Sequence, residues 1–141
     1  MAGYSKRTLV EKLGIKDSYR ILFINSPDNY RKLLGKIPQK AQFEKEYRDL
    51  DLKDTYDFIQ FFVTNQEALG EMFPIFVKHL MKSGMLWISW PKGAYCTFVG
   101  SDLNENIIRD IGLKNGVVDV KVIAVDENWS GLKFVYRLKD R

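Results

Sequence analysis

Four apolar runs of strand length stand out along the chain, and polar residues interrupt them rarely. They lie at 19–25, 56–64, 82–90 and 117–125. A nearly unbroken apolar run is typical of a strand that is covered on both faces, as in a parallel sheet. The four runs therefore predict a mostly parallel sheet with helices on both sides.

The last strand that the pattern predicts, 131–139, has a different character. Apolar and basic residues alternate along it, which is typical of a strand with one exposed face. The apolar set is Leu132, Phe134, Tyr136 and Leu138, and the basic set is Lys133, Arg137 and Lys139. We expect this strand to pair antiparallel with 117–125 and close the fold as a hairpin.

Helical segments are predicted before and after the first strand. The first spans 4–16, with Ser5 as its N-cap and Gly14 as its left-handed stop. After the first strand, a turn at 26–28 leads into a short second helix that carries Tyr30. Residues 38–56 show the weakest pattern, and within them 41–47 is predicted to form a short edge strand.

A longer helix is predicted to follow Asn65, where apolar residues recur at helical spacing. These residues are Leu69, Met72, Phe73, Phe76 and Leu80. Pro74 should kink or split this helix, and Gly84 should stop it. A loop is expected at 93–100 and a last helix at 104–116.

Strands that alternate with helices and end in a hairpin indicate one α/β domain over residues 1–141. Numbered along the chain, the six strands are predicted in the order 2-1-3-4-6-5. The strand at 20–25 is expected to be central, and the strand at 131–138 to be antiparallel to its neighbour.

Composition narrows the classes of function. The longest apolar run is far shorter than a membrane span, and the amino-terminal residues show no secretory signal, so we expect a cytoplasmic protein that does not enter the membrane. One cysteine, Cys96, and one histidine, His79, leave no disulfide and no cluster of such metal ligands. The net charge is +4, and residues 1–56 hold 12 Lys and Arg against 8 Asp and Glu. Acidic residues interrupt this basic excess throughout, so nucleic acid is an unlikely partner.

Two resemblances follow from the order of elements and from short motifs. The segment 79–91 and the closing hairpin resemble Rossmann-like methyltransferases, which implies a single-domain Rossmann-like layered fold. The motifs at 90–92, Trp-Pro-Lys, and 125–134, VDENWSGLKF, are similar to a family of small bacterial proteins known as a domain of unknown function. Segments 2–16, 101–113 and 118–122 also resemble that family, which implies no particular activity.

The chemistry expected of a methyltransferase lacks its usual support in this sequence. A cofactor cradle needs a glycine-rich turn after the first strand, and residues 21–34 contain no glycine. Pro27 also removes a backbone N–H from that turn. We therefore expect no cofactor, neither S-adenosylmethionine nor NAD nor FAD, and no catalytic residue; Cys96 is interpreted as an inert thiol.

Polar or aromatic residues mark four of the strand ends. In an open parallel sheet, ligands lie outside the carboxyl ends of the strands, so we expect these residues to share one rim. The candidate ligand-binding residues are Asn25, Ser26, Asp28, Thr64, Asn65, Trp90, Lys92, Asp126, Glu127 and Trp129. In the alternative, Lys92 pairs with Asp126 or Glu127 and the two tryptophans pack a structural corner.

The leading functional hypothesis is a non-catalytic, methyltransferase-like module that binds a small ligand or a protein partner at this rim. One alternative is a cryptic enzyme of the same fold. A weaker alternative is a nucleic-acid binder, which the basic amino-terminal half suggests.

Overall fold

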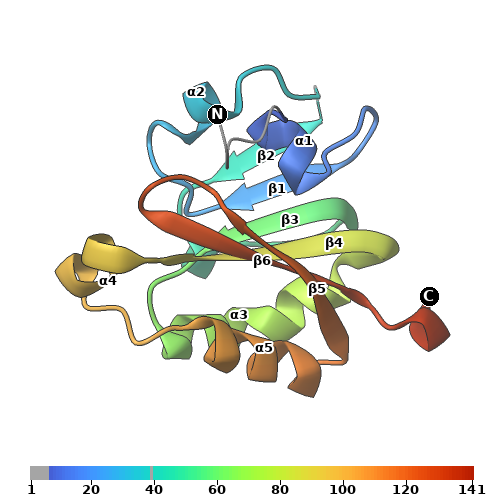
Figure 1. The fold of residues 1–141 in the computed structure, drawn as a ribbon. Helices are drawn as coiled ribbons and strands as arrows, with labels where there is room; N and C mark the ends of the chain where they lie inside the picture. Colours follow the sequence, from blue (N-terminus) through green and yellow to red (C-terminus); the bar gives the residue numbers. More distant parts are fainter. Residues whose placement is uncertain (1–6, 39) are drawn as a thin grey trace.

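A six-stranded sheet lies between two layers of helices in the computed structural model, which describes residues 7–38 and 40–141 (Figure 1). The strands are β1 (Ile21–Ile24), β2 (Ala41–Glu44), β3 (Tyr56–Phe62), β4 (Leu80–Pro91), β5 (Val117–Ala124) and β6 (Trp129–Tyr136). The helices are α1 (Leu9–Leu13), α2 (Tyr30–Leu34), α3 (Gln66–Lys78), α4 (Gly93–Val99) and α5 (Glu105–Lys114). Two short 3-10 turns are η1 (Tyr47–Asp49) and η2 (Leu138–Asp140). No helix in the described part of the chain is long and apolar enough to cross a membrane.

The order of the strands across the sheet is β2-β1-β3-β4-β6-β5, as the sequence predicts. β1 pairs in parallel with β2 and β3, and β3 pairs in parallel with β4. β6 is antiparallel to both β4 and β5, so the closing hairpin is confirmed. The prediction that the strand at 20–25 is central is wrong. One strand, β2, extends the sheet beyond β1, so β3 and β4 occupy the middle.

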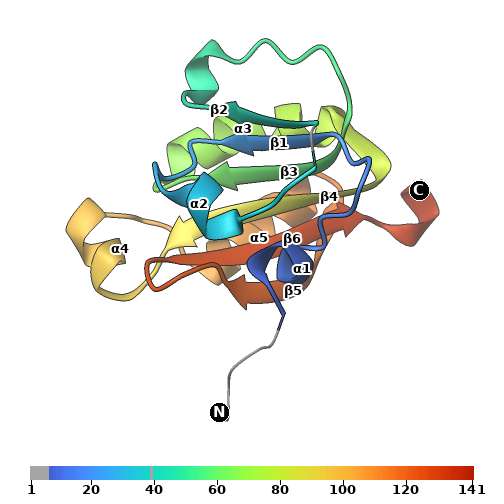
Figure 2. The ribbon, with the colours of Figure 1, turned by 90° about the horizontal axis from the view of Figure 1, so that it is seen from above.

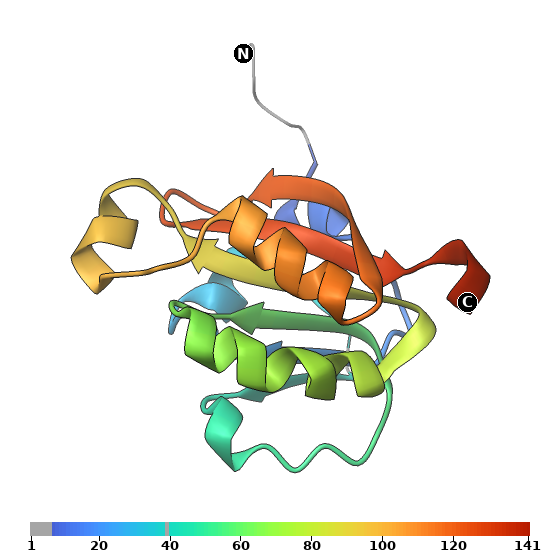
Figure 3. The same ribbon diagram turned by 90° about the horizontal axis from the view of Figure 1, so that it is seen from below.

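Helices cover both faces of the sheet, which explains the unbroken apolar runs. α3 and α5 pack against one face, and α1 and α2 pack against the other (Figures 1 and 3). All four residues of β1 are buried as a result. Trp87 of β4 is fully buried beside α1, and its Nε1–H donates to the Leu13 carbonyl at 2.9 Å. One tryptophan therefore packs beneath a helix as core.

The amino-terminal helix is shorter than the sequence pattern suggests. Thr8 is its N-cap, and the Thr8 side chain accepts a hydrogen bond from the Glu11 N–H while Glu11 reaches back to Thr8. This reciprocal arrangement satisfies two backbone donors at the helix start. Gly14 ends the helix with φ at 84°, as expected. Ser5, the predicted cap, lies outside the described residues.

The long helix begins as predicted but ends earlier. The Asn65 side chain accepts from the Ala68 N–H at 2.8 Å, and α3 then continues through Pro74 without being split in two. His79 is its C-cap, so Leu80 and Gly84 belong to β4 rather than to the helix. Gly84 lies where β4 bulges against β3, and a Cβ there would be 2.9 Å from the Asp57 carbonyl oxygen. This close approach, rather than a helix stop, requires glycine.

Two further expectations, about the residues that follow β4 and about the end of β6, are wrong. Residues 93–100 are not a loop, because Gly93–Val99 form α4. Leu138 does not share the buried face of the last strand, because β6 ends at Tyr136 and Leu138, in η2, is 80% exposed. The short edge strand predicted in 41–47 is confirmed as β2.

Two helical glycines give a matched test of packing. A Cβ at Gly112 in α5 would lie 2.1 Å from a ring carbon of Phe134, whereas a Cβ at Gly70 in α3 meets nothing within 4 Å. We expect Gly112→Ala to destabilise the protein by about 1–3 kcal/mol through overpacking. Gly70→Ala should stabilise it by about 0.4–1 kcal/mol, because alanine restricts the unfolded chain. Urea denaturation measures both, and a Gly112→Ala protein as stable as wild type would contradict this packing.

Candidate functional site at the carboxyl edge of the sheet

The predicted rim residues follow strands that end at the same edge of the sheet. β1, β2, β3 and β4 run in the same direction, and the pairing of Pro91 with Trp129 brings the β5–β6 turn to the end of β4. In Figure 1 this edge is the one from which α4 projects. The structure divides the predicted residues at this edge into three groups with different surroundings.

The first group lines a groove between the ends of β1 and β2. Asn25, Ser26 and Asp28 face η1 and the residues before it across a cavity of about 410 Å³, whose other lining residues are Lys45, Glu46 and Tyr47. The Asn25 N–H donates to the Glu44 carbonyl at 2.9 Å, which fixes the turn against β2. Asn25 has a φ of 59°, a left-handed conformation that asparagine tolerates better than most residues. A smaller cavity next to the groove adds Pro27, Arg31, Phe43 and Glu44 to this wall.

The second group, Thr64 and Asn65, lies between β3 and α3. The Asn65 side chain is used to cap α3. The next residue, Gln66, bonds Asp102 twice, through its backbone N–H at 2.8 Å and its side-chain amide at 3.0 Å. These bonds fasten the start of α3 to the segment between α4 and α5. The immediate role of Asn65 is thus to position a helix.

The third group is the corner where β4 meets the β5–β6 turn. β4 ends at Pro91, as predicted, and the Lys92 N–H donates to the Asn128 carbonyl at 2.9 Å. Asp126 Oδ1 accepts hydrogen bonds from the backbone N–H groups of Asn128 at 2.8 Å and Trp129 at 2.9 Å. The Asp126 carboxylate therefore caps its own turn.

The predicted ion pair at this corner is wrong. Among the described residues, no salt bridge joins Lys92 to Asp126 or Glu127. The two tryptophans also separate, because Trp90 belongs to the core on the α3 and α5 side and Trp129 to the core on the α1 and α2 side. Two indoles and a cation therefore do not converge on one point.

A row of aromatic rings fills the space above the strand ends on the α2 side. Tyr30 contacts Phe62 at 4.7 Å between ring centroids, Phe62 contacts Trp129 at 5.1 Å, and Trp129 contacts Tyr95 at 5.5 Å. The first two contacts are edge-to-face, a favourable geometry for aromatic pairs. Sequence reasoning did not single out Tyr30, Phe62 or Tyr95 as site residues, since nothing in their spacing shows that their rings meet.

A buried chain of hydrogen bonds lies beneath this row. The Tyr30 hydroxyl donates to Gln60 Oε1 at 2.7 Å, and Gln60 Nε2 donates to Ser89 Oγ at 2.9 Å. Gln60 and Ser89 are both fully buried. Burial raises the pKa of Tyr30 above its ordinary value; the bond to Gln60 lowers it, and the nearby Asp126 carboxylate raises it further. The sequence carried a signal for this chain, because Gln60 and Ser89 are polar residues inside apolar runs.

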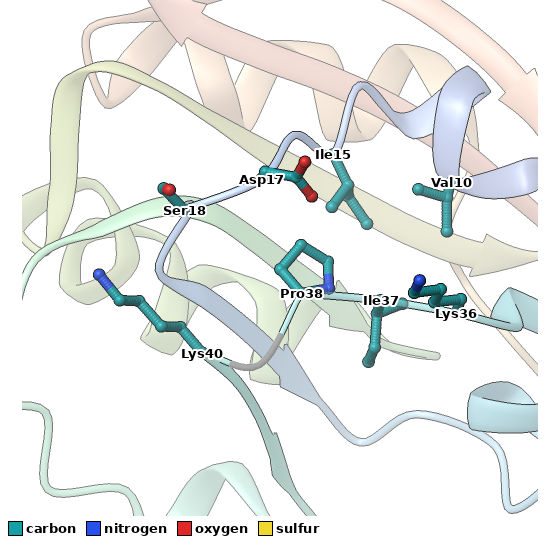
Figure 4. A pocket seen from close by; sticks show the side chains of 8 residues that line it. All are labelled: Val10, Ile15, Asp17, Ser18, Lys36, Ile37, Pro38 and Lys40. Atoms are coloured by element: carbon teal, nitrogen blue, oxygen red, sulfur yellow. The ribbon is translucent and has the colours of Figure 1, made fainter.

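A larger cavity, of about 580 Å³, lies away from the predicted rim (Figure 4). Val10, Ile15, Asp17 and Ser18 form one wall, and Lys36, Ile37, Pro38 and Lys40 form the other. In Figure 4 the two rows face each other across the opening. The walls come from the segments that precede β1 and β2, so this cavity opens at the amino end of those strands. Its sequence signal is weak, because two irregular connections create it.

The side chains at the edge provide no evident metal centre. Among the described residues, no group of three or more His, Cys, Asp and Glu side chains could hold a metal ion. Cys96 is half-buried, with its Sγ 3.9 Å from the Ser101 carbonyl oxygen. The chemistry that the edge offers is hydrogen bonding and mixed charge in the groove beside β1.

Solved structures place this fold among the methyltransferases. Ribosomal protein L11 methylase from Lactobacillus delbrueckii subsp. bulgaricus matches with a TM-score of 0.60 at 14% identity, over 92% of this chain and 75% of that chain. A SAM-dependent methyltransferase from Aquifex aeolicus matches with a TM-score of 0.60 at 16% identity, over 89% and 86%. Magnesium protoporphyrin IX methyltransferase from Synechocystis PCC 6803 with bound SAM matches with a TM-score of 0.58 at 12% identity, over 92% and 74%.

The chain therefore has an α/β Rossmann-like methyltransferase fold, with a mostly parallel six-stranded sheet and antiparallel carboxyl-terminal strands. At these identities the likeness shows the fold alone. No protein-family model and no curated protein sequence matches the chain. The resemblance to a small bacterial family at 90–92 and 125–134 thus stays a prediction.

The buried hydrogen-bond chain can be tested by removing one hydroxyl. Tyr30→Phe leaves Gln60 Oε1 without its donor in a buried site, and we expect a loss of about 1–3 kcal/mol in the free energy of unfolding. Tyr47→Phe is the control, because its hydroxyl bonds the exposed Arg48 side chain; it should change stability by less than about 0.5 kcal/mol. Urea denaturation of both variants measures the difference.

The raised pKa of Tyr30 adds a dependence on pH. As the pH rises above about 10, the Tyr30 phenol of the unfolded chain loses its proton, whereas the same phenol in the folded protein stays protonated. Wild-type stability should therefore fall as pH rises above that value, and Tyr30→Phe should show a smaller fall. Equal falls in the two proteins would contradict the burial of the hydroxyl.

The corner at 90–92 gives a second contrast. Trp129 is 7% exposed and packs on Phe62 and Tyr95, so Trp129→Ala should cost about 3–5 kcal/mol. Lys92 has no ion pair among the described residues, so Lys92→Ala should stay within about 0.5 kcal/mol of wild type. Urea unfolding curves decide the point; a large loss in Lys92→Ala would restore a structural role for its ammonium group.

Proposed function

We propose that this protein is a non-catalytic module of methyltransferase-like fold that binds a small ligand or a protein partner at the carboxyl edge of its sheet. The observation that carries the proposal is the contact of Tyr30 with Phe62 across the ends of β1 and β3. That contact lies where a ligand of an enzyme with this topology is expected.

The position of the contact follows from the strand order. In open α/β sheets, ligands bind outside the carboxyl ends of the strands, where the strand order reverses. Here the chain passes from β1 to β2 on one side and then to β3 on the other, so the reversal lies between β1 and β3. Tyr30 comes directly after β1, Phe62 ends β3, and the hydroxyl of Tyr30 is bonded to Gln60 within β3. Protein side chains therefore occupy the usual crevice.

The backbone beside the crevice supports the same proposal. The turn from Asn25 to Asn29 contains no glycine, and Pro27 offers no N–H to a ligand. α2 has five residues, and Asn29 at its start makes no side-chain capping bond. Such a short helix presents little of the aligned N–H array that binds the anionic groups of a cofactor.

Two features of the same edge remain open for binding. The groove at Asn25, Ser26 and Asp28 has a mixture of carboxylates and the Lys45 ammonium group, which suits a small polar ligand. α4 projects from the end of β4, and its Phe98 ring is 85% exposed while stacking loosely on Tyr95 (Figure 1). An exposed ring of this kind is the sort of anchor that protein interfaces use.

A cryptic enzyme of this fold is the alternative, and the likeness to SAM-dependent methyltransferases favours it. Thermal unfolding with and without S-adenosylmethionine separates the two. A bound ligand in large excess over its Kd stabilises by about 2–3 kcal/mol, which would raise Tm by several degrees in a chain of this size. We expect no such rise with S-adenosylmethionine or S-adenosylhomocysteine, and a clear rise would overturn the non-catalytic assignment.

Thermal unfolding of variants also tests whether the ligand binds in the groove. A panel of nucleotides, small organic acids and a short RNA is screened for a rise in Tm. We expect the stabilising compound to lose its effect in an Asp28→Ala, Lys45→Ala double variant and to keep it in Lys53→Ala, whose ammonium group lies by Asp51 away from the groove. If the compound still raises Tm in both variants, it binds away from the groove.

A further inference from the structure

Four lysines gather on the face of the sheet that α1 covers. Lys12 is in α1, Lys16 follows that helix, Lys121 is in β5 and Lys133 is in β6. In Figure 2, α1 lies in front of β5 and β6. The Lys121 ammonium group donates to the Lys12 carbonyl at 3.2 Å, which fixes the distance between β5 and the end of α1.

The register of the sheet brings two of these lysines together. Lys121 and Lys133 are directly opposite each other in the antiparallel β5–β6 pair. Like charges in that position repel each other and weaken the pairing of strands. Lys133 is also half-buried, because its other cross-strand neighbour is the fully buried Trp87 beneath α1. An anionic ligand bound between the two ammonium groups would offset this repulsion.

The charges on these lysines influence one another. Burial lowers the pKa of Lys133, and the charges of Lys121 and Lys16 lower it further. Burial also lowers the pKa of Lys121, followed by the charges of Arg7 and Lys12. For both groups the neighbouring charges that act on the pKa are positive. Together with the cross-strand pairing of Lys121 and Lys133 and the bond from Lys121 to the Lys12 carbonyl, this places the four lysines around one patch of the surface.

The salt bridges among the described residues involve none of these four lysines. The salt bridges among the described residues join Arg20 to Asp54, Lys53 to Asp51, and Arg109 to both Glu105 and Asp119. Glu11, in the same helix as Lys12, is bonded to Thr8 in the capping box. In the part of the chain that the structure describes, the four lysines thus form no salt bridge.

We propose that Lys12, Lys16, Lys121 and Lys133 form a site for the phosphate groups of a small phosphorylated ligand. A phosphate carries close to two negative charges and several acceptor oxygens, so one group can offset the repulsion between neighbouring amines. Lysine binds phosphate as a point charge without a fixed fork, which suits amines that come from three separate segments. The ring beside Lys133 is the buried Trp87, which offers a nucleic-acid base no exposed face for stacking.

This site goes beyond the proposed function at the carboxyl edge. Lys133 pairs with Trp87, four residues before β4 ends at Pro91, which is about 13 Å along a strand. Lysines from both ends of the sequence contribute to this site, so it brings together part of the positive charge of the chain.

Inorganic triphosphate is the probe, titrated into the full chain by calorimetry at about 50 mM salt, where charge interactions are weakly screened. Lys133→Gln should bind triphosphate about tenfold more weakly, since each lost contact to phosphate removes a charge interaction. Lys78→Gln is the matched control, an exposed lysine at the end of α3 on the other side of the sheet, and should bind as wild type does. Lys133→Gln should also unfold at the same temperature as wild type or higher, because it relieves the repulsion from Lys121. Retained folding shows that weaker binding is not loss of structure.

Amide shifts in nitrogen-edited NMR spectra locate the bound triphosphate. Shifts at 12–16, 121–123 and 131–135 support the proposal. Shifts confined to 25–28 and 45–47 would overturn it, because the probe would then occupy the carboxyl-edge groove, and the proposed function would stand. Equal binding by Lys133→Gln and wild type, or no binding by wild type, would also overturn it. Strong binding of a ten-nucleotide single-stranded DNA without binding of triphosphate would favour nucleic acid instead.

Discussion

The hydrogen bonds that run from Tyr30 through Gln60 to Ser89 are the constraint on which the carboxyl edge depends. Gln60 lies in the middle of the sheet, where an amide without partners would be costly. Both ends of its side chain are satisfied, by a residue of α2 and by a residue of β4. α2 must therefore lie where Tyr30 reaches β3. Because only the short turn at 25–29 joins β1 to α2, the bond from Tyr30 to Gln60 also fixes the position of this turn and of the groove beside it.

The side chains at the carboxyl edge are specified separately from the topology of the sheet. The sheet topology results from apolar runs and from the handedness of their connections, which many sequences satisfy. The crevice depends on a few side chains at the strand ends, and in this chain Tyr30, Phe62 and Trp129 pack against one another there. A TM-score of 0.60 to a methyltransferase at 14% identity shows the shared topology alone.

The sequence predicted the order of the strands because apolar runs, helix caps and the hairpin each leave local signals. The expectation that the strand at 20–25 is central did not agree with that order, in which β1 lies between the edge strand β2 and β3. The prediction of an ion pair at Lys92 was wrong for a different reason. The backbone of Lys92 does meet the β5–β6 turn, but the Asp126 carboxylate is used by backbone N–H groups of its own turn. Gln60 and Ser89 were visible as polar residues in apolar runs, yet their pairing depends on the register of β3 against β4.

A single irregularity in β5 explains how charges of opposite sign are kept apart. Asp119 and Lys121 are two residues apart, and in a regular strand both side chains would point to the same face. The pairing with β6 shifts between them, where Asp119 is opposite Phe134 and Lys121 is opposite Lys133. A bulge of this kind redirects side chains. Asp119 consequently bonds Arg109 of α5 at 2.9 Å on one face, whereas Lys121 reaches the end of α1 on the other. The bulge thus directs the Asp119 carboxylate away from the lysine cluster, although Asp119 is only two residues from Lys121.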